Sequence, residues 1–487
     1  MEPLSWTGAI AFLNPILMFS LAALALAILA WMILSVLMPE PAATVNPDGT
    51  VSLAAGPLTM AGSAVRLLFL LTVAAAAAYL MLGAVMGTGA GIVGAISQRF
   101  LPVWLALAAL FAASIIFKRR LGLYGKLFDS PIGMIGFALV MFWVFTGVFG
   151  AMDLIITHNP LDQVSGMKNK LPGTPVPGAA EGEFQWYLLG GDNLARDVFS
   201  RLVKGAWEVI KIAPLAAMFA FMVGITLGLP AGYYGGRLDT FLSFLANLIL
   251  AFPVILLFYL LVTPEIVATG VPNYMAIVLF LFPIIFLAVL LNSRYYTTPK
   301  FRTPLLIVVL GIALWLYLSL VSTGGDLIRT RDYAIWGLPS GLDLFDVPGG
   351  ILVVFVSVVF VNSPTVFRIV RGLTMDIKTR DYVAAAQTRG EGPWYIMLWE
   401  ILPNARGPLI VDFCLRIGYT TILLGTLGFF GLGLPPESPD WGSTINDGRK
   451  LLSIYLHPAL PPAFALLTLV LGLNLLADGL REESLKD

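Results

Sequence analysis

Charged residues are scarce in this sequence, and so are cysteine and histidine. Only 12% of its 487 residues are charged, whereas 58% are hydrophobic; soluble domains carry roughly 25% charged residues. A soluble chain of this composition would have no polar surface to present to water, so a soluble fold is excluded. The single cysteine, Cys414, excludes a disulfide framework within the chain. With only two histidines, His158 and His457, we expect no Cys/His metal site.

A net charge is also missing, because 29 Lys and Arg balance 29 Asp and Glu. A balanced chain has no overall field to attract nucleic acid or an acidic partner, so we expect no nucleic-acid partner. The phosphate-binding pattern G-x-x-x-x-G-K-[ST] is absent, so we expect no ATP hydrolysis and no catalytic residues in this chain. Residues 1–15 lack a basic segment, and the apolar run that follows could span a bilayer. We therefore expect no cleavable signal peptide.

Long apolar runs are what the sequence has in abundance. A membrane-spanning helix needs about 20 apolar residues, because the hydrocarbon core is ~30 Å thick and a helix rises ~1.5 Å per residue. The ten-residue alternation of a membrane β-barrel is not seen. We predict an all-α polytopic membrane protein with about eleven spans. They lie near residues 14–38, 64–86, 101–117, 131–155, 208–232, 240–262, 273–291, 304–321, 350–370, 409–429 and 459–479.

Lysine and arginine are concentrated in loops that the positive-inside rule places in the cytoplasm. These loops lie near residues 118–126, 292–303 and 371–406. The resulting topology has the N-terminus outside and the C-terminus inside. Residues 156–205 are rich in Pro, Gly, Asp and Lys and are too polar to span, so they predict an external element.

The last of the internal loops contains two short helical stretches. Residues Tyr382–Thr388 predict a helix that ends near Gly390, since glycine adopts the left-handed turn that commonly ends helices. A second stretch, Trp394–Leu402, precedes Pro403. The residues alone are compatible with an amphipathic connector on the membrane surface. They are equally compatible with a docking site that a partner approaches closely through Ala384–Ala386.

This loop resembles the EAA loop of ABC importer permeases, in which Glu-Ala-Ala is followed by Gly and by Ile-Leu-Pro. The matching positions are Ala384–Ala386, Gly390 and Ile401–Pro403. In that family the loop forms a coupling helix that docks into a groove on the ATPase subunit. Ala384 stands where the motif has Glu, so any salt bridge that this Glu makes in relatives is missing here. The resemblance assigns ATPase coupling to Asp381, Tyr382, Ala384, Ala385, Ala386, Arg389, Gly390, Leu402 and Pro403.

Four further segments resemble the C-type dipeptide/oligopeptide permeases of ABC importers. Residues 231–253 are similar to that family's second cytoplasmic turn and third core helix. Residues 431–449 and 473–482 are similar to its external loop and its last helix. Residues 190–206 resemble its signature G-T-D-x-x-G-R-D-x-x-S-R, although Gly191 and Ala195 depart from it. The external-loop residues that match are Asp192, Arg196, Asp197, Ser200 and Arg201.

Several of these residues also have a structural interpretation. Asp192, Arg196 and Asp197 either form an ion-pair cluster that holds the external element together or contact a binding protein. Asp412 and Arg416 lie four residues apart in a predicted span and can pair on one helix face, although intramembrane charges are often functional.

Prolines before Trp441, at positions 435, 436 and 439, are expected to stiffen a turn and to anchor this aromatic residue at the membrane interface. Polar residues on predicted core helices are candidates for lining the solute pathway, and helix packing is their alternative role. These pathway candidates are Asn247, Asn474 and Asp478.

The resemblance covers residues 125–263 and 349–487 and implies a six-helix permease core with about five extra spans. We therefore expect four segments. They are accessory helices in 1–117, the first part of the core in 118–263 with the external loop 156–205, an inserted transmembrane hairpin in 264–348, and the second part of the core in 349–487 with the coupling loop 381–403.

The resemblance implies a permease subunit of an ATP-driven importer of di- or oligopeptides or similar solutes, in the inner (plasma) membrane of a bacterium or archaeon. Its partners would be a B-type permease, two ABC ATPase subunits that hold ATP and Mg, an extracytoplasmic solute-binding protein and lipids. The chain itself would hold no cofactor or metal. The alternative is a secondary transporter or a subunit of a proton-translocating complex. Such proteins have ionisable residues at the membrane midplane or broken helices in paired repeats, and the sequence shows few of the former and no clear repeat.

Overall fold

The computed structural model describes residues 2–38, 43–45, 51–53, 56–180, 182–323, 349–432 and 438–484. Contacts divide the chain into two compact units. Unit 1 comprises Met1–Pro102 and Asp162–Phe199, and unit 2 comprises Val103–Leu161 and Ser200–Asp487. Residues 324–348 of the predicted insert lie outside the described residues, as do Pro435 and Pro436 of the predicted turn.

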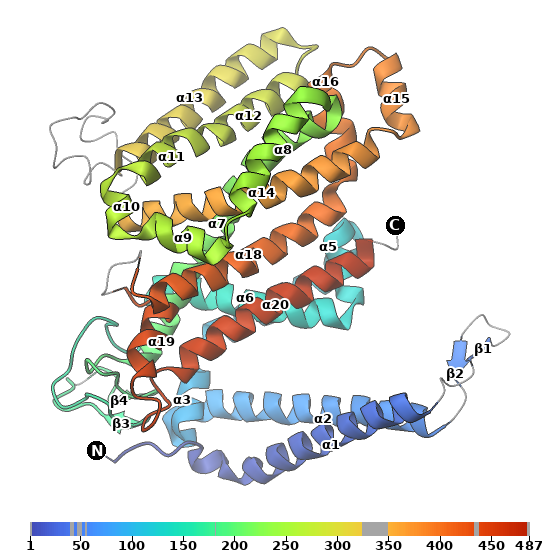
Figure 1. Ribbon diagram of the computed structural model, residues 1–487. Helices are drawn as coiled ribbons and strands as arrows, with labels where there is room; N and C mark the ends of the chain where they lie inside the picture. Colours follow the sequence, from blue (N-terminus) through green and yellow to red (C-terminus); the bar gives the residue numbers. More distant parts are fainter. Residues whose placement is uncertain are drawn as a thin grey trace. The chain divides into compact units, whose positions relative to one another are not determined.

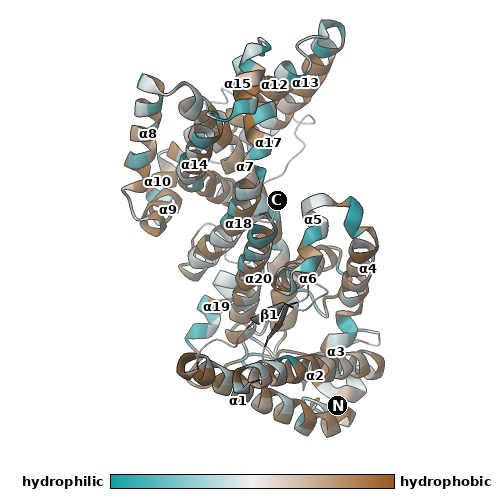
Figure 2. Ribbon diagram, turned by 90° about the vertical axis from the view of Figure 1, so that its right-hand side faces the viewer, coloured by the Kyte–Doolittle hydropathy of each residue, from teal (hydrophilic) through white to brown (hydrophobic). Residues whose placement is uncertain are grey.

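Helices long and apolar enough to cross a membrane dominate the structure. The described residues contain ten of them, and one further pair of shorter helices is bent by 81° at its junction (Figure 1). The all-α polytopic membrane fold is thereby confirmed. Figure 2 shows hydrophobic residues along the lengths of α1, α2 and α4, with hydrophilic residues gathered at α5, α15 and α17. The ten spans are Gly8–Leu37, Pro57–Arg99, Leu101–Arg120, Pro131–Ala151, Val198–Tyr234, Val271–Arg294, Pro299–Leu320, Gly350–Ile377, Arg406–Phe429 and Leu460–Glu483.

The span predicted at 240–262 is not one continuous helix, because it corresponds to the bent pair. Helix α8 (Gly236–Leu250) ends before Pro253, and α9 (Val254–Val262) begins directly after it. Proline has no N–H to donate to a helix and disfavours the helical conformation in the residue before it. Pro253 therefore forces the break.

Unit 1 combines the N-terminal helices with most of the polar element. The first residues contact that element directly: Leu4 N donates to Gly173 O at 2.9 Å, and Trp186 Nε1 donates to Glu2 O at 3.2 Å. The Arg99 guanidinium lies 4.7 Å from the ring centre of Phe184. The compact units thus group residues differently from the predicted segment 1–117. The elements of unit 1 are η1 (Gly8–Leu13), α1 (Asn14–Leu37), β1 (Ala43–Val45), β2 (Val51–Leu53), α2 (Pro57–Met86), η2 (Gly87–Ala90), α3 (Gly91–Arg99), β3 (Thr174–Pro175) and β4 (Trp186–Tyr187); β1 pairs with β2, and β3 with β4, both antiparallel.

Unit 2 contains the remaining spans and the short helices at their ends. Small residues let α6 and α20 approach closely, since a Cβ on Gly472 would lie 2.8 Å from Leu139 Cβ and 3.2 Å from Gly136 O. The elements are α4 (Leu101–Phe117), η3 (Lys118–Arg120), α5 (Gly122–Lys126), η4 (Leu127–Asp129), α6 (Pro131–Ala151), α7 (Val198–Tyr234), α8, α9, α10 (Pro264–Ala268), α11 (Val271–Leu279), α12 (Leu281–Arg294), α13 (Pro299–Thr323), α14 (Gly349–Ile377), α15 (Asp381–Thr388), α16 (Pro393–Tyr395), η6 (Ile396–Ile401), α17 (Leu402–Asn404), α18 (Arg406–Phe429), α19 (Trp441–Arg449) and α20 (Leu460–Ser484).

The short helices of unit 2 lie at opposite ends of its spans. Figure 1 shows α5, α15 and α16 toward the right-hand end of this unit and α9, α10 and α19 toward its left-hand end. The element predicted at 156–205 ends earlier than expected, because α7 already begins at Val198.

Candidate functional site

The short helix α15 lies between the spans α14 and α18, where the sequence predicts the coupling loop. Asp381 is in its first turn, where a negative charge is favoured by the helix dipole. The chain leaves the helix through Gly390, which has φ +79 and donates its N–H to Gln387 O at 2.9 Å. The predicted helix and its termination at Gly390 are confirmed.

The three alanines of this helix face different surroundings. Ala386 is completely buried and packs with Val383 in the apolar core of unit 2, whereas Ala384 and Ala385 are exposed. A helix turns about 100° per residue, so positions three apart share a face and three consecutive residues do not. The prediction that all three alanines form one small exposed face is therefore wrong. The outward surface of α15 carries Asp381, Tyr382, Ala384 and Ala385.

Polar contacts tie α15 to its neighbours on two sides. Gln387 Nε2 donates to Tyr233 Oη at 3.2 Å, which connects α15 to the end of α7. Arg389 Nη2 donates to Glu400 Oε1 at 2.9 Å, which connects it to η6. Partial desolvation raises the pKa of Tyr382, and the phenol is neutral at physiological pH.

The second predicted stretch, Trp394–Leu402, is helical but not one α-helix. It consists of α16, the π-helical segment η6 and the start of α17. Pro403 has no N–H to donate to the carbonyl of Trp399, which removes one bond of the α-pattern there. Leu402 is half-buried and Pro403 is exposed.

A charged clamp that the sequence interpretation missed joins α8 to α14. Arg371 Nη2 donates to Asp239 Oδ2 at 2.6 Å, and Ser243 Oγ donates to Asp239 Oδ1 at 3.1 Å. Arg368 Nη2 donates to Asn247 Oδ1 at 2.9 Å. The exposed pathway candidate Asn247 therefore belongs to the same set of polar contacts between α8 and α14. Asp239 and Arg371 are more than a hundred positions apart in the sequence. Only their opposite charges could have indicated that they pair.

The matched residues of the external signature are buried and hold the element together. Within unit 1, Arg196 Nε donates to Asp192 Oδ2 at 2.7 Å, and both side chains are almost inaccessible. Asp192 Oδ1 also accepts from Leu194 N at 2.8 Å and from Arg196 N at 2.9 Å. Asp197 Oδ1 accepts from Phe199 N at 3.2 Å at the start of α7. For Asp192 and Arg196, the structure shows the ion pair that was one of the two interpretations.

Arg201, the last matched residue of that signature, belongs to unit 2 and is fully buried. Its Nη2 donates to Ser438 O at 3.0 Å and to Thr444 Oγ1 at 3.3 Å. It therefore connects α7 to the loop and helix that precede α20.

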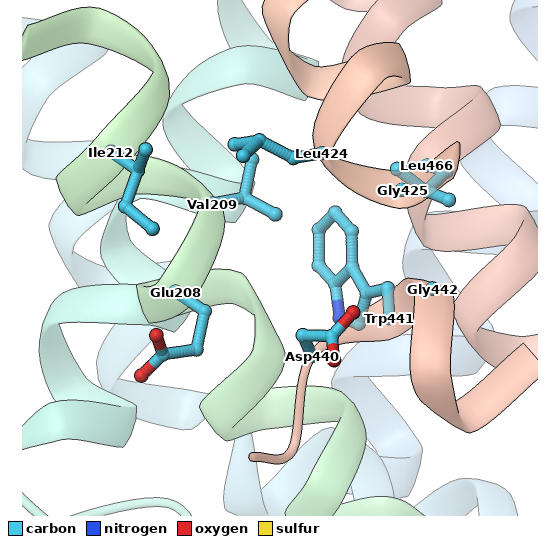
Figure 3. A pocket seen from close by; sticks show the side chains of 9 residues that line it. All are labelled: Glu208, Val209, Ile212, Leu424, Gly425, Asp440, Trp441, Gly442 and Leu466. Carbon is cyan, nitrogen blue, oxygen red and sulfur yellow. The ribbon is translucent and has the colours of Figure 1, made fainter. Parts of the chain in front are cut away.

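Trp441 is buried inside unit 2, so its ring packs against protein and does not form the exposed interface anchor that was predicted. Its Nε1 donates to Leu202 O at 2.8 Å, and its ring meets that of Trp143 edge-on at 5.0 Å. Figure 3 shows the Trp441 ring between Val209 on one side and Gly425 on the other. Asp440 caps α19 by accepting from Ser443 N at 3.0 Å, and burial raises the pKa of Asp440.

The remaining pathway candidates make separate contacts on α20. Asn474 is exposed and lines an open, mainly apolar groove between α18 and α20. Asp478 is exposed and lies 3.6 Å from Arg481. The predicted pair on α18 is confirmed, since Arg416 Nη2 lies 3.3 Å from Asp412 Oδ1. Across the described ranges, no group of three or more His, Cys, Asp or Glu residues is arranged to hold a metal ion.

The structure is a polytopic helical membrane protein with a short helix between two of its spans, an arrangement that a membrane transport permease can have. Residues 297–482 match the family of binding-protein-dependent transport system inner membrane components; the match begins within the predicted insert 264–348. This segment is similar to that family of transport permeases, which confirms the predicted resemblance to ABC importer permeases.

Curated relatives agree with this assignment. The chain is 28% identical over 302 residues to the glutathione transport system permease protein GsiD of Pectobacterium atrosepticum, covering 62% of this chain and 73% of the relative. It is 24% identical over 359 residues to the dipeptide transport system permease protein DppC of Alkalihalophilus pseudofirmus, covering 74% and 87%. For the DppC protein of Haemophilus influenzae the identity is 27% over 306 residues, covering 63% and 76%.

Proposed function

We propose that this chain is a transmembrane subunit of an ATP-driven importer for di- or oligopeptides or similar solutes. The observation that carries the proposal is α15, a short helix whose inner face is fixed to the protein and whose outer face is exposed. The names of the relatives, which transport dipeptides and glutathione, support a peptide-like solute.

The partners that we propose follow from the family. A B-type permease completes the pathway, two ABC ATPase subunits bind ATP and Mg, and an extracytoplasmic binding protein delivers the solute. The complex lies in the inner membrane of a bacterium or archaeon, with α15 on the cytoplasmic side.

Docking would use the outer face of α15, and transmission would use its inner face. Asp381, Tyr382 and Ala385 are available to an ATPase groove. Val383 and Ala386 lie in the same apolar cluster as Phe221 and Leu229 of α7. Because protein interiors are close-packed and transmit strain, a displacement of α15 would move α7 with it.

The test replaces Ala385 by Trp in the complete complex. A large ring at a close contact commonly costs about 1–3 kcal/mol, and 1.4 kcal/mol is roughly tenfold in an equilibrium constant. Co-purification of the ATPase subunits and solute-stimulated ATP hydrolysis should therefore fall clearly. Ala268→Trp, on the exposed surface of α10, is the matched control and should leave both unchanged.

Two results would contradict this proposal. A full ATPase complement with wild-type stimulation in Ala385→Trp would show that α15 is not the docking helix. Uptake that survives ATP depletion while the proton gradient is intact would instead favour a secondary transporter.

A further inference from the structure

The cytoplasmic end of α12 meets the coupling segment at Trp399. The guanidinium of Arg294, in the last turn of α12, lies 4.6 Å from the centre of the Trp399 ring. Trp399 Nε1 donates to Ser293 Oγ at 3.1 Å, and the same hydroxyl donates to Leu290 O at 3.0 Å. Ser293 is buried, and both of its hydrogen bonds are partly buried. Arg294 thus contacts the face of the Trp399 ring, and Ser293 accepts a hydrogen bond from the N–H of the same ring.

Apolar contacts extend this junction toward α15. Phe286, Val289 and Leu290 of α12 pack against the core cluster that contains Val383 and Ala386 of α15. The inner face of the short helix therefore rests on a cluster to which α12 contributes. A change in the position of α12 would alter the surface on which α15 sits.

The segment η6 joins the two helices through adjacent side chains. Trp399 binds the end of α12, and Glu400 binds Arg389 just after α15. Both lie in a π-helical stretch, and π-helical turns are rare and frequently occur at functional sites. Two consecutive residues thereby connect α12 to the end of the coupling helix.

We propose that the α12–α13 hairpin positions the coupling segment, with Ser293, Arg294 and Trp399 as its positioning residues. This inference rests on the proposed function, because it assigns to the hairpin a role in transmitting ATPase motion through α15. Loosening the junction leaves ATP hydrolysis running while less solute moves for each ATP. A hairpin that only contacts lipid would have no such effect.

The experiment uses the complete complex in proteoliposomes with its binding protein, and glutathione and the dipeptide Ala-Ala as probes. A cation over an aromatic ring contributes about 0.5–1 kcal/mol at an exposed site, which corresponds to about a two- to fivefold change. Arg294→Gln should therefore lower the solute moved per ATP by about two- to fivefold. Arg294→Lys should retain most of the ratio, because it keeps a cation over the ring. Lys300→Gln, an exposed cation on α13, is the matched control and should behave as wild type.

The amount of solute moved per ATP hydrolysed distinguishes a positioning role of these residues from general damage to the complex. A purely structural role would lower the yield of complex and reduce hydrolysis and uptake together, leaving the ratio unchanged. Unchanged ratios in both Arg294→Gln and Trp399→Phe would overturn the inference while the proposed function stands. If the wild-type complex shows no ATP-dependent uptake of either probe, the proposed function fails, and this inference fails with it.

Discussion

Replacing Trp441 by alanine should destabilise unit 2 more than any surface change. The side chain is 1% exposed, and its indole N–H donates to Leu202 O. The helix α7 has a glycine facing it: a Cβ on Gly205 would lie 2.7 Å from Trp441 Nε1. The ring therefore packs tightly against α7 at Gly205 and against Trp143.

The expected loss follows from burial. Truncating a buried Phe or Trp to Ala typically costs about 3–5 kcal/mol, because packing is lost and a cavity remains. Trp441→Phe keeps much of the ring and loses the N–H donor, so its cost should approach that of one hydrogen bond, about 0.5–1.5 kcal/mol. The order of stability should be wild type, Trp441→Phe, then Trp441→Ala.

Cys414 provides the assay, because it is the chain's single thiol and is buried. A fluorogenic thiol reagent in detergent should react as unit 2 unfolds. A loss of 1 kcal/mol shifts the midpoint by roughly 2–4 °C in domains of 150–250 residues and by less in a larger unit such as unit 2. At a cost of about 3–5 kcal/mol, Trp441→Ala should still unfold several degrees lower. A wild-type midpoint for Trp441→Ala would refute the reasoning that this residue locks α19 in place.

Three further outcomes are expected. A cysteine at Tyr296, which is 71% exposed, should resist an impermeant thiol reagent added outside cells in a Cys414→Ser background; labelling from outside would reverse the topology. Asp192→Ala removes one partner of the buried pair with Arg196, which typically costs about 3–5 kcal/mol; the external element should become protease-sensitive, and wild-type resistance would contradict this. Burial raises the pKa of Asp440, so the folded state is penalised once this carboxyl is charged, and stability should fall as pH rises from the ordinary carboxyl pKa through the raised one. Asp440→Asn keeps a capping oxygen but has no charge, so its free energy of unfolding, measured by circular dichroism, should not fall over this pH range. If the variant shows the same pH dependence as wild type, the charge on Asp440 is not its cause.

Sequence alone determined the membrane character, the approximate spans and the resemblance to a permease family. In lipid, the backbone N–H and C=O groups of an apolar run of about 20 residues must form hydrogen bonds within the protein. Among local structures, only a helix pairs all of these groups within the segment itself. The end of α15 at Gly390 was also predictable, because a left-handed turn is a property of one residue. The break at Pro253 was available by the same local argument, although the sequence interpretation read through it.

Tertiary structure decided which side chains face inward and what they meet. Ala384, Ala385 and Ala386 are identical in chemistry, and only the rotation of α15 about its axis buries the third of them. The contact between Ser293 and Trp399 joins positions 106 residues apart, and no local pattern marks it. Burial and long-range pairing depend on neighbours that the fold brings together, so they could not be derived from the spacing of residues along the chain.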